Sequence, residues 1–268
     1  MFLTVASFDI GYVSFGQYVE DVDITQIKDL EARYDSLPKK EKRRTRGIIS
    51  DDLQEIINDL LTIGSRVNGG VFDFTEEDNQ GYDLRVRKNF LKHMEDHRWL
   101  WINCDIFVIE QQYYSAGMGR GKGSKASTGT ANMNAIKLGE CLYTWLLINY
   151  PNAHITYFGS QFKTQILGAP DKITKPQRKK WAVEKYSEIS TLRGDQDMIN
   201  IFLLSSFMKR KRVSPETVSG YLEKYPVVSE DAKQLAIRVV TEKQKLDDIS
   251  DPVVQLKAYI FKEMIAVF

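Results

Sequence analysis

Hydrophobic positions divide the chain into short apolar runs and longer stretches in which apolar residues recur every three or four positions. The short runs, at 4–11, 13–19, 106–109 and 154–158, are typical of strands. The longer stretches predict helices, because their apolar residues fall on one face of a 3.6-residue turn. The expected helices lie at 48–63, 82–101, 131–149, 161–167, 176–186 and 198–208, followed by one from 214, one over 229–242 and a last one near 247.

The order of these elements predicts an α/β fold in which helices cover a mixed sheet. The continuous apolar run Ile106–Ile109 fits a central strand buried on both faces. Asn68–Gly70 is interpreted as a turn, and Val71–Phe74 as a short strand after it. The residues Ile24–Tyr34 show neither the short apolar run of a strand nor the helical spacing of apolar residues. No repeat or linker divides residues 1–268, so we expect a single domain.

Composition is that of a globular protein, with 43% hydrophobic and 27% charged residues in 268. The net charge of +1 means that any affinity for nucleic acid must come from local basic clusters. Cys104 and Cys141 lie in apolar surroundings, which indicates reduced thiols. No membrane span, signal peptide or transit peptide is visible, and the first strand begins almost at Met1. We therefore expect an intracellular protein of the cytoplasm or nucleus that does not bind membranes.

Two of the apolar runs carry a carboxylate. Asp9 lies near the end of Thr4–Gly11, where Gly11 lets the backbone turn away. Alone, an acid at a strand end is typical of a turn or a cap. On a central buried strand, however, a carboxylate is costly unless it is paired, hydrogen-bonded or bound to a cation. Glu110 follows four consecutive apolar residues and is expected deep at the sheet.

Three more carboxylates, Asp247, Asp248 and Asp251, stand at the expected start of the last helix. One interpretation is structural, because acids favour helix N-termini. Pro252 indicates that the helix starts close by, since proline is tolerated in a first turn. Asp248 and Asp251 are three positions apart and share a face. Acids converging from two strands and a helix make an oxygen cage for Mg²⁺, which predicts a two-metal phosphodiester hydrolase.

The acidic motifs, taken in order, resemble those of a known family. Ser7–Gly11, Val108–Gln111 and Asp248–Asp251 are similar to motifs of the RuvC-type Holliday junction resolvases of the RNase H-like superfamily. The version at Lys245–Asp251 most resembles the poxvirus and fungal mitochondrial branch. Lys137–Gly139, and Gln161–Lys163 followed by Gly168, are similar to two further family segments. The resemblance covers roughly 1–20, 104–180 and the last helix.

This resemblance implies an RNase H-like mixed sheet, with helical insertions at about 25–103 and 187–244 that are longer than in the bacterial enzymes. It implies that Asp9, Glu110, Asp248 and Asp251 hold two Mg²⁺ or Mn²⁺ ions. Asp247 stays open as a ligand, because either member of this acidic pair serves in the branch. Lys163 would be an electrostatic helper near the scissile phosphate, and Tyr113 would stack at the junction centre.

A four-way DNA junction presents phosphates on several arms, so its binder needs cationic surface around the acidic centre. The glycine-rich loop 117–125 and the basic helix 175–180 follow elements that carry or flank the expected site. Runs 39–46 and 209–212 are also basic, and each cluster alone fits an ordinary solvated face. The residues that we expect to contact DNA are Tyr113, Tyr114, Arg120, Lys122, Lys125, Lys175, Arg178, Lys179 and Lys180.

These features together predict a structure-selective endonuclease, a crossover junction endodeoxyribonuclease that nicks four-way DNA junctions symmetrically as a homodimer. Paired nicks on opposed strands need two equivalent sites. One alternative is another RNase H-like nuclease acting on RNA–DNA hybrids or other branched DNA. Another is an actin-like ATPase, although no second glycine-rich phosphate loop is visible. A third is a catalytically inert nucleic-acid-binding scaffold. The branch resemblance favours a large cytoplasmic DNA virus as the source.

Overall fold

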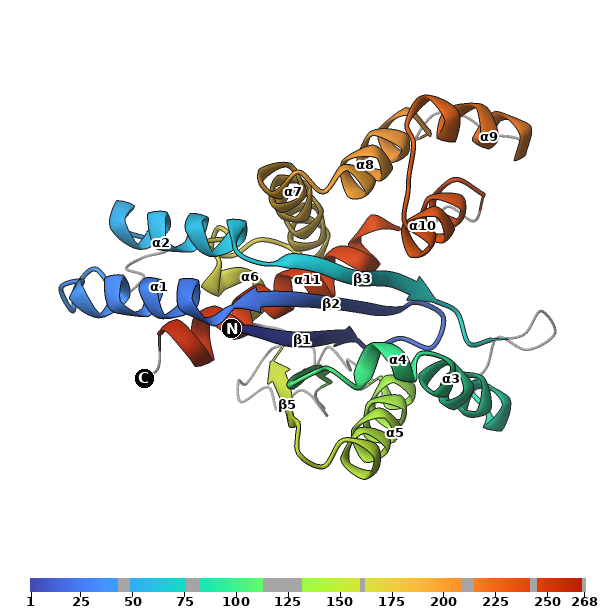
Figure 1. Cartoon of the computed structure of the whole chain (residues 1–268), viewed down its shortest axis with the longest axis horizontal. Coiled ribbons are helices and arrows are strands. Elements are labelled where there is room, and N and C mark those ends of the chain that lie inside the picture. Colours follow the sequence, from blue (N-terminus) through green and yellow to red (C-terminus); the bar gives the residue numbers. More distant parts are fainter. Residues whose placement is uncertain are drawn as a thin grey trace, which may run out of the picture.

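A computed structural model describes residues 1–42, 49–75, 82–112, 132–159, 162–208, 215–241 and 245–266. Its centre is a five-stranded sheet with strand order β3-β2-β1-β4-β5 (Figure 1). The strands are β1 Phe2–Asp9, β2 Phe15–Asp23, β3 Ser65–Phe72, β4 Ile106–Gln111 and β5 His154–Gly159. β1, β2 and β3 are antiparallel, whereas β4 and β5 run parallel to β1. The mixed sheet with flanking helices, expected of an RNase H-like α/β fold, is confirmed.

Helices cover both faces of this sheet. In chain order they are α1 Ile24–Ser36, α2 Asp51–Thr62, α3 Leu84–Asp96, α4 Arg98–Trp101, α5 Met133–Asn149, α6 Phe162–Ile166, α7 Lys175–Arg193, α8 Gln196–Met208, α9 Pro215–Lys224, α10 Glu230–Thr241 and α11 Leu246–Ile260, which continues as the π-helical turn Phe261–Ile265. α11 lies across one face with α7 beside it, and α3, α4 and α5 lie on the other (Figure 1). Within the described residues, no helix is long and apolar enough for a membrane span.

Alternation along the strands separates two hydrophobic clusters. Val5 of β1 packs in the cluster that contains the buried side chains of α11, whereas Ala6 and Phe8 pack in the cluster beneath α3, α4 and α5. Because successive side chains point to opposite faces, Ser7 and Asp9 lie on the α11 face with Val5. Any chemistry built on Asp9 therefore develops between the sheet and α11.

The expected turn at Asn68–Gly70 is wrong, because these residues lie inside β3. The two glycines serve close packing instead. A Cβ on Gly69 would lie 3.2 Å from the Tyr18 ring, and one on Gly70 would lie 2.8 Å from the Phe72 ring. The segment Ile24–Tyr34, which showed neither pattern, forms most of α1, and Asp23 caps this helix by accepting from Thr25 N.

The expected first-turn position of Pro252 is also wrong. α11 begins at Leu246, so the proline lies six positions further along, inside the helix. Pro252 has no N–H group to donate to the carbonyl of Asp248. This stretch of helix backbone lies against Gly16 of β2, where an added Cβ would meet the Asp248 oxygen at well under 3.0 Å. The glycine therefore allows α11 to approach the sheet closely.

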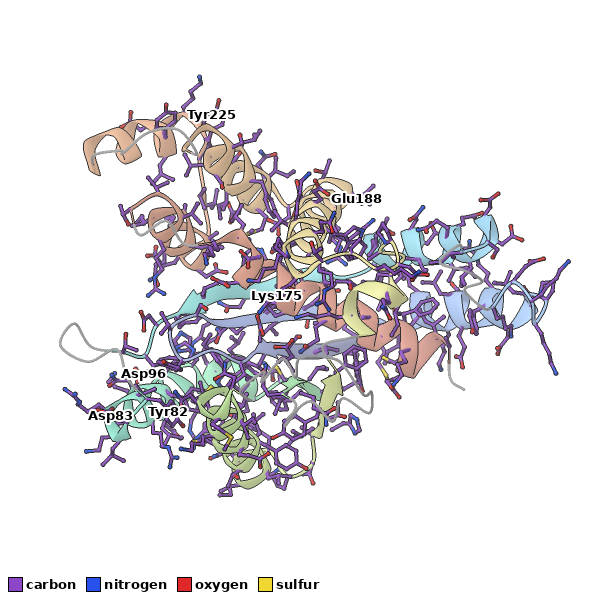
Figure 2. All side chains as sticks on the ribbon, turned by 180° about the vertical axis from the view of Figure 1, so that it is seen from behind. Tyr82, Asp83, Asp96, Lys175, Glu188 and Tyr225 are labelled. Carbon is purple, nitrogen blue, oxygen red and sulfur yellow. The ribbon has the colours of Figure 1, made fainter. Side chains whose placement is uncertain are left out.

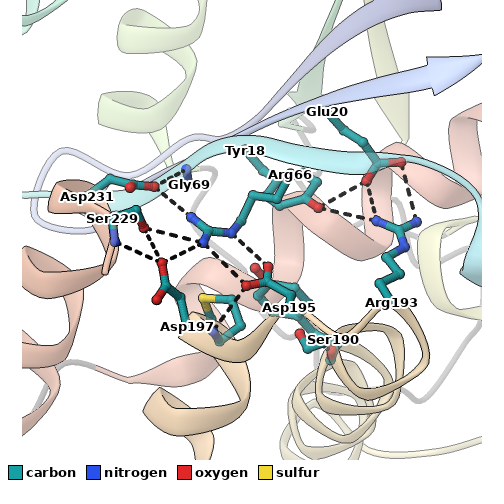
Figure 3. A network of polar contacts seen from close by, with 12 residues as sticks. Tyr18, Glu20, Arg66, Gly69, Ser190, Arg193, Asp195, Asp197, Ser229 and Asp231 are labelled. Atoms are coloured by element: carbon teal, nitrogen blue, oxygen red, sulfur yellow. Dashed lines mark hydrogen bonds and ion pairs between the residues drawn. The ribbon is translucent and has the colours of Figure 1, made fainter. Parts of the chain in front are cut away.

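One buried arginine joins the helices after α7 to the edge of the sheet (Figure 3). Arg66 of β3 donates from Nε to Asp195 at 2.8 Å and from Nη1 to Asp231 at 2.8 Å. Its Nη2 lies 3.4 Å from Asp197. Asp231 also accepts from the backbone N–H of Gly69 at 3.1 Å. These contacts attach α8 and α10 to the outermost strand, β3. The bond to Asp231 also gives the Gly69 N–H group a hydrogen-bond acceptor, which an edge strand otherwise lacks.

Candidate active site

Two of the predicted acids lie side by side at the carboxyl ends of neighbouring parallel strands. β1 pairs with β4 in a register that sets Phe8 opposite Ile109, so Asp9 and Glu110 are the next pair. The even positions of β4, Ile106 and Val108, pack in the α11 cluster, and Glu110 continues that face. Strand pairing and alternation alone therefore bring these two carboxyls together beneath α11.

A third acid and a lysine complete the cluster from two helices. Lys163 of α6 donates from Nζ to Glu110 Oε1 at 3.0 Å. The same Nζ lies 3.4 Å from Asp251 Oδ1 on α11. The side chains of Lys163 and Glu110 are each only 9% exposed, and that of Asp251 is 16% exposed. Four elements thus deliver three carboxyls and one ammonium group to a site largely closed to water.

Burial and mutual repulsion shift the pKa values of these acids. Burial, with the negative charge of Glu110, raises the pKa of Asp9 well above its usual range, although Lys163 opposes the shift. Burial also acts to raise the pKa of Glu110, but the charge of Lys163 and the hydrogen bonds with Asp9, Lys163 and Gln112 together outweigh burial, and the pKa is lowered. A hydrogen bond between the Asp9 and Glu110 side chains adds to both shifts, raising the pKa of Asp9 and lowering that of Glu110. Burial raises the pKa of Asp251, again against the effect of Lys163.

The remaining two acids of α11, Asp247 and Asp248, lie in different electrostatic surroundings. Asp247 forms an ion pair with Lys179 of α7. Burial and the neighbouring charge of Asp247 raise the pKa of Asp248 to about 6, and Asp251 adds to the shift. Asp248 thus shares the electrostatic field of Asp251, whereas Asp247 is engaged by a cation from a different helix.

The donor set suits a hard divalent cation in type and in charge. Three carboxylates with one ammonium carry two negative charges when all three acids are ionised, and oxygen donors of this kind are what Mg²⁺ and Mn²⁺ prefer. In the described part of the chain, no three His, Cys, Asp or Glu side chains are already arranged as a metal-binding group. Lys163 instead contacts two of the three carboxyls.

Four of the residues predicted to contact DNA lie on the first two turns of α7. Thr174 caps this helix by a reciprocal arrangement with Gln177, and Pro176 occupies its first turn. Figure 2, which views the molecule from the α11 side, labels Lys175 at the beginning of α7. Lys175, Arg178 and Lys180 are exposed, whereas Lys179 is half-buried. Lys180 pairs with Glu184 of its own helix, at 3.3 Å. The other predicted contacts, Tyr113, Tyr114, Arg120, Lys122 and Lys125, lie outside the described residues.

Two residues near the acids have no counterpart in the sequence analysis. Gly16 of β2 lies opposite Asp9 and beneath the backbone of Asp248. Gln255 of α11 is completely buried and donates to both acid-bearing strands. A signal for the glutamine was present, because it is a polar residue one helical turn after Asp251 in an otherwise apolar stretch. No comparable signal distinguishes Gly16 from other glycines.

Comparisons with known proteins give relatives without an assigned activity. No family model matches the chain. It is 27% identical over 197 residues to uncharacterized protein 97L of Invertebrate iridescent virus 3, spanning 70% of this chain and 86% of that protein. It is 24% identical over 259 residues to uncharacterized protein 170L of Invertebrate iridescent virus 6, spanning 95% of this chain and 87% of that protein.

Among solved structures, the chain is similar to two Holliday junction resolvases. One is the Fowlpox virus resolvase in complex with Holliday junction DNA, at 12% identity and a TM-score of 0.41, with 96% of this chain and 97% of that chain covered. The other is RuvC of Thermus thermophilus, at 13% identity and a TM-score of 0.35, with 91% and 92% covered. These values are too low to assign an activity, which has to come from the chemistry of the site.

Proposed function

We propose that this protein is a structure-selective DNA endonuclease that resolves four-way junctions by paired, symmetric nicks. The observation that carries the proposal is the convergence of Asp9, Glu110 and Asp251 on Lys163. A buried excess of carboxylates is costly for a fold, and perturbed acids of this kind gather at functional sites. The ordered motif resemblance to RuvC-type resolvases supports a four-way junction as the substrate.

In this proposal Asp9, Glu110 and Asp251 hold the divalent cations, and Asp248 is the fourth ligand. Asp248 is preferred to Asp247 because the charge of Asp251 adds to burial and to the charge of Asp247 in raising the pKa of Asp248. When bound, two Mg²⁺ or Mn²⁺ ions supply an activated water and positive charge at the scissile phosphate. Lys163 contributes a fixed positive charge at the same place: burial acts to lower its pKa, but the charges of Glu110, Asp251 and Asp9 together outweigh burial and raise the pKa.

DNA would lie along the exposed basic face of α7. Lys175, Arg178 and Lys180 stand on the helix whose Lys179 touches the acidic cluster, so phosphates bound there lie next to the site. The loop residues Tyr113, Tyr114, Arg120, Lys122 and Lys125 remain proposed contacts on the strength of the sequence. Symmetric nicking further requires two equivalent sites, and hence a homodimer.

The test is cleavage of a synthetic mobile four-way junction with each strand labelled in turn, in the presence of Mg²⁺ or Mn²⁺. We expect paired nicks at symmetric positions, and their loss in Asp9→Asn with junction binding retained. Asp105→Asn is the matched control, because Asp105 lies at the opposite end of β4, is exposed and accepts from Thr4 N at 2.9 Å. The Asp105→Asn substitution removes one carboxylate at the start of β4, far from the cluster, and the variant should cut normally.

Three results would contradict the proposal. The first is that the intact protein cuts no branched DNA with either cation. The second is that it cuts only a ribose-containing strand, which would indicate an RNase H. Full activity in Asp9→Asn would show that the cluster is not the reaction centre.

A further inference from the structure

Gln255 contacts all the secondary structure that carries the acids. It lies on α11 four positions after Asp251, so the two side chains share a helix face. Its Nε2 donates to Ser7 Oγ at 3.1 Å and to the Phe8 carbonyl at 3.1 Å, both on β1. The same nitrogen lies 3.3 Å from the Val108 carbonyl on β4. Phe8 directly precedes Asp9, and Val108 stands two positions before Glu110.

Stability alone does not account for a glutamine at this position. The side chain is 0% exposed, and its Oε1 has no hydrogen-bond partner among the described residues. A buried acceptor left unsatisfied costs about 1–3 kcal/mol. An apolar residue of the same length would avoid that cost and pack against the same cluster. What such a residue would lack is the pair of N–H groups aimed at β1 and β4.

The other contacts of α11 leave its placement over these two strands poorly defined. Ile249, Val253 and Leu256 make apolar contacts, which are non-directional. A second directional contact, from Lys257 to Glu20, reaches β2, a strand that carries none of the clustered acids. Within the described residues around the acids, the Lys163 ammonium joins Asp251 to Glu110 through a third element, whereas the Gln255 amide is a direct hydrogen-bonded link from α11 to both β1 and β4.

We propose that Gln255 is a positioning residue that sets the distance between the Asp251 carboxylate and the Asp9–Glu110 pair. This inference rests on the proposed nuclease function. The amide ties one turn of α11 to the ends of β1 and β4, so the carboxyl one turn earlier is held over the two strand carboxyls. A shift of about 1 Å in such a group is enough to cost on the order of 10²-fold in rate.

The test compares Gln255→Met with the intact protein in three measurements. Methionine keeps the length of the side chain but removes both donors and the unsatisfied Oε1. We expect equal or higher resistance to urea, junction affinity within about twofold, and a cleavage rate lower by roughly 10- to 100-fold. We also expect weaker binding of Mn²⁺ alone, measured by calorimetry, because the ligands no longer hold their spacing.

Leu256→Met is the matched control, since Leu256 is the next residue, is equally buried and touches neither acid-bearing strand through a hydrogen bond. It should leave Mn²⁺ affinity and cleavage unchanged. A Gln255→Met protein with intact rate and intact Mn²⁺ affinity would overturn the positioning role. So would losses that simply follow the unfolded fraction, or that appear equally in Leu256→Met.

The two proposals fail in different ways. If the intact protein cuts no junction but binds Mn²⁺, and Gln255→Met weakens that binding, the nuclease assignment is wrong and the positioning role stands. If the intact protein does not bind Mn²⁺ at all, the positioning role is overturned as well.

Discussion

Replacing Gly16 with alanine tests whether the close approach of α11 to the sheet sets the geometry of the site. Gly16 pairs with Asp9 across β2 and β1. An added Cβ would meet the Asp248 carbonyl oxygen at well under 3.0 Å and Pro252 Cγ at 3.3 Å. The first of these atoms is helix backbone and does not rotate away as a side chain does. Relief to an ordinary contact of about 3.5 Å requires the first turns of α11 to move by roughly 1 Å.

That movement has a calculable effect on the acids. Asp248 and Asp251 travel with α11, whereas Asp9 and Glu110 stay with the sheet. A displacement of about 1 Å between groups that act together costs on the order of 10²-fold in rate. Overpacking of this kind costs about 1–3 kcal/mol of stability, which a full domain tolerates. We therefore expect Gly16→Ala to remain folded and to bind junctions, yet to cut them about 100-fold more slowly.

The assay is single-turnover cleavage with the protein in excess over a labelled junction, together with urea unfolding and a binding titration. Gly220→Ala is the control, because among the described residues no atom outside the backbone of α9 and the adjoining residues lies within 4 Å of the position where its Cβ would stand. That substitution should leave cleavage unchanged and stabilise the helix by about 1 kcal/mol. A folded Gly16→Ala protein that cuts at the normal rate would refute the reasoning, because the position of α11 would then not control the acids.

Three further predictions follow from other contacts. Arg66→Met should lower the free energy of unfolding by about 3–5 kcal/mol, since it leaves carboxylates buried without their cation; a change below 1 kcal/mol in urea unfolding would contradict this. Replacing Lys175 and Arg178 together with alanine should weaken junction binding and reduce the slope of log affinity against log salt by roughly 1.8, and an unchanged slope would remove α7 from the DNA surface. Burial, helped by the nearby charge of Arg193, lowers the pKa of Lys257 to about 7. The unfolded chain then binds more protons than the folded one above that pH, so stability should rise from about pH 7 towards pH 10, and Lys257→Met should flatten this rise.

The sheet was largely predictable from the sequence because its signals are local. The apolar runs at Thr4–Gly11 and Ile106–Ile109 identify strands without knowledge of their partners. Asn68–Gly70 was misread for the converse reason. Its glycines are required by the Tyr18 and Phe72 rings, and only the assembled sheet brings the Tyr18 ring beside them. Local glycine content indicates a turn, and tertiary packing overrides it.

The acids of the candidate site were also predictable, but the partner of each acid was not. The sequence identified the carboxylates of α11 without distinguishing Asp247 from Asp248. What separates them is Lys179, which is 68 positions away in the chain and donates a hydrogen bond to Asp247. Gln255 escaped prediction because its partners include backbone carbonyls 147 and 247 positions away. Residues whose roles depend on such distant backbone contacts carry no motif of their own.

Gly16 and Gln255 both act on the placement of α11 over the sheet, in two different directions. Gly16 limits how closely the backbone of α11 approaches the sheet, and Gln255 limits how far the helix slides along β1 and β4. Both act at the α11 segment that carries Asp248 and Asp251, so neither needs to touch a substrate to affect the reaction. The hydrophobic contacts beneath α11 are non-directional, so they hold the helix against the sheet without fixing its position along the strands. The geometry of the acids is therefore determined by where α11 lies, as a rigid body, over two parallel strands.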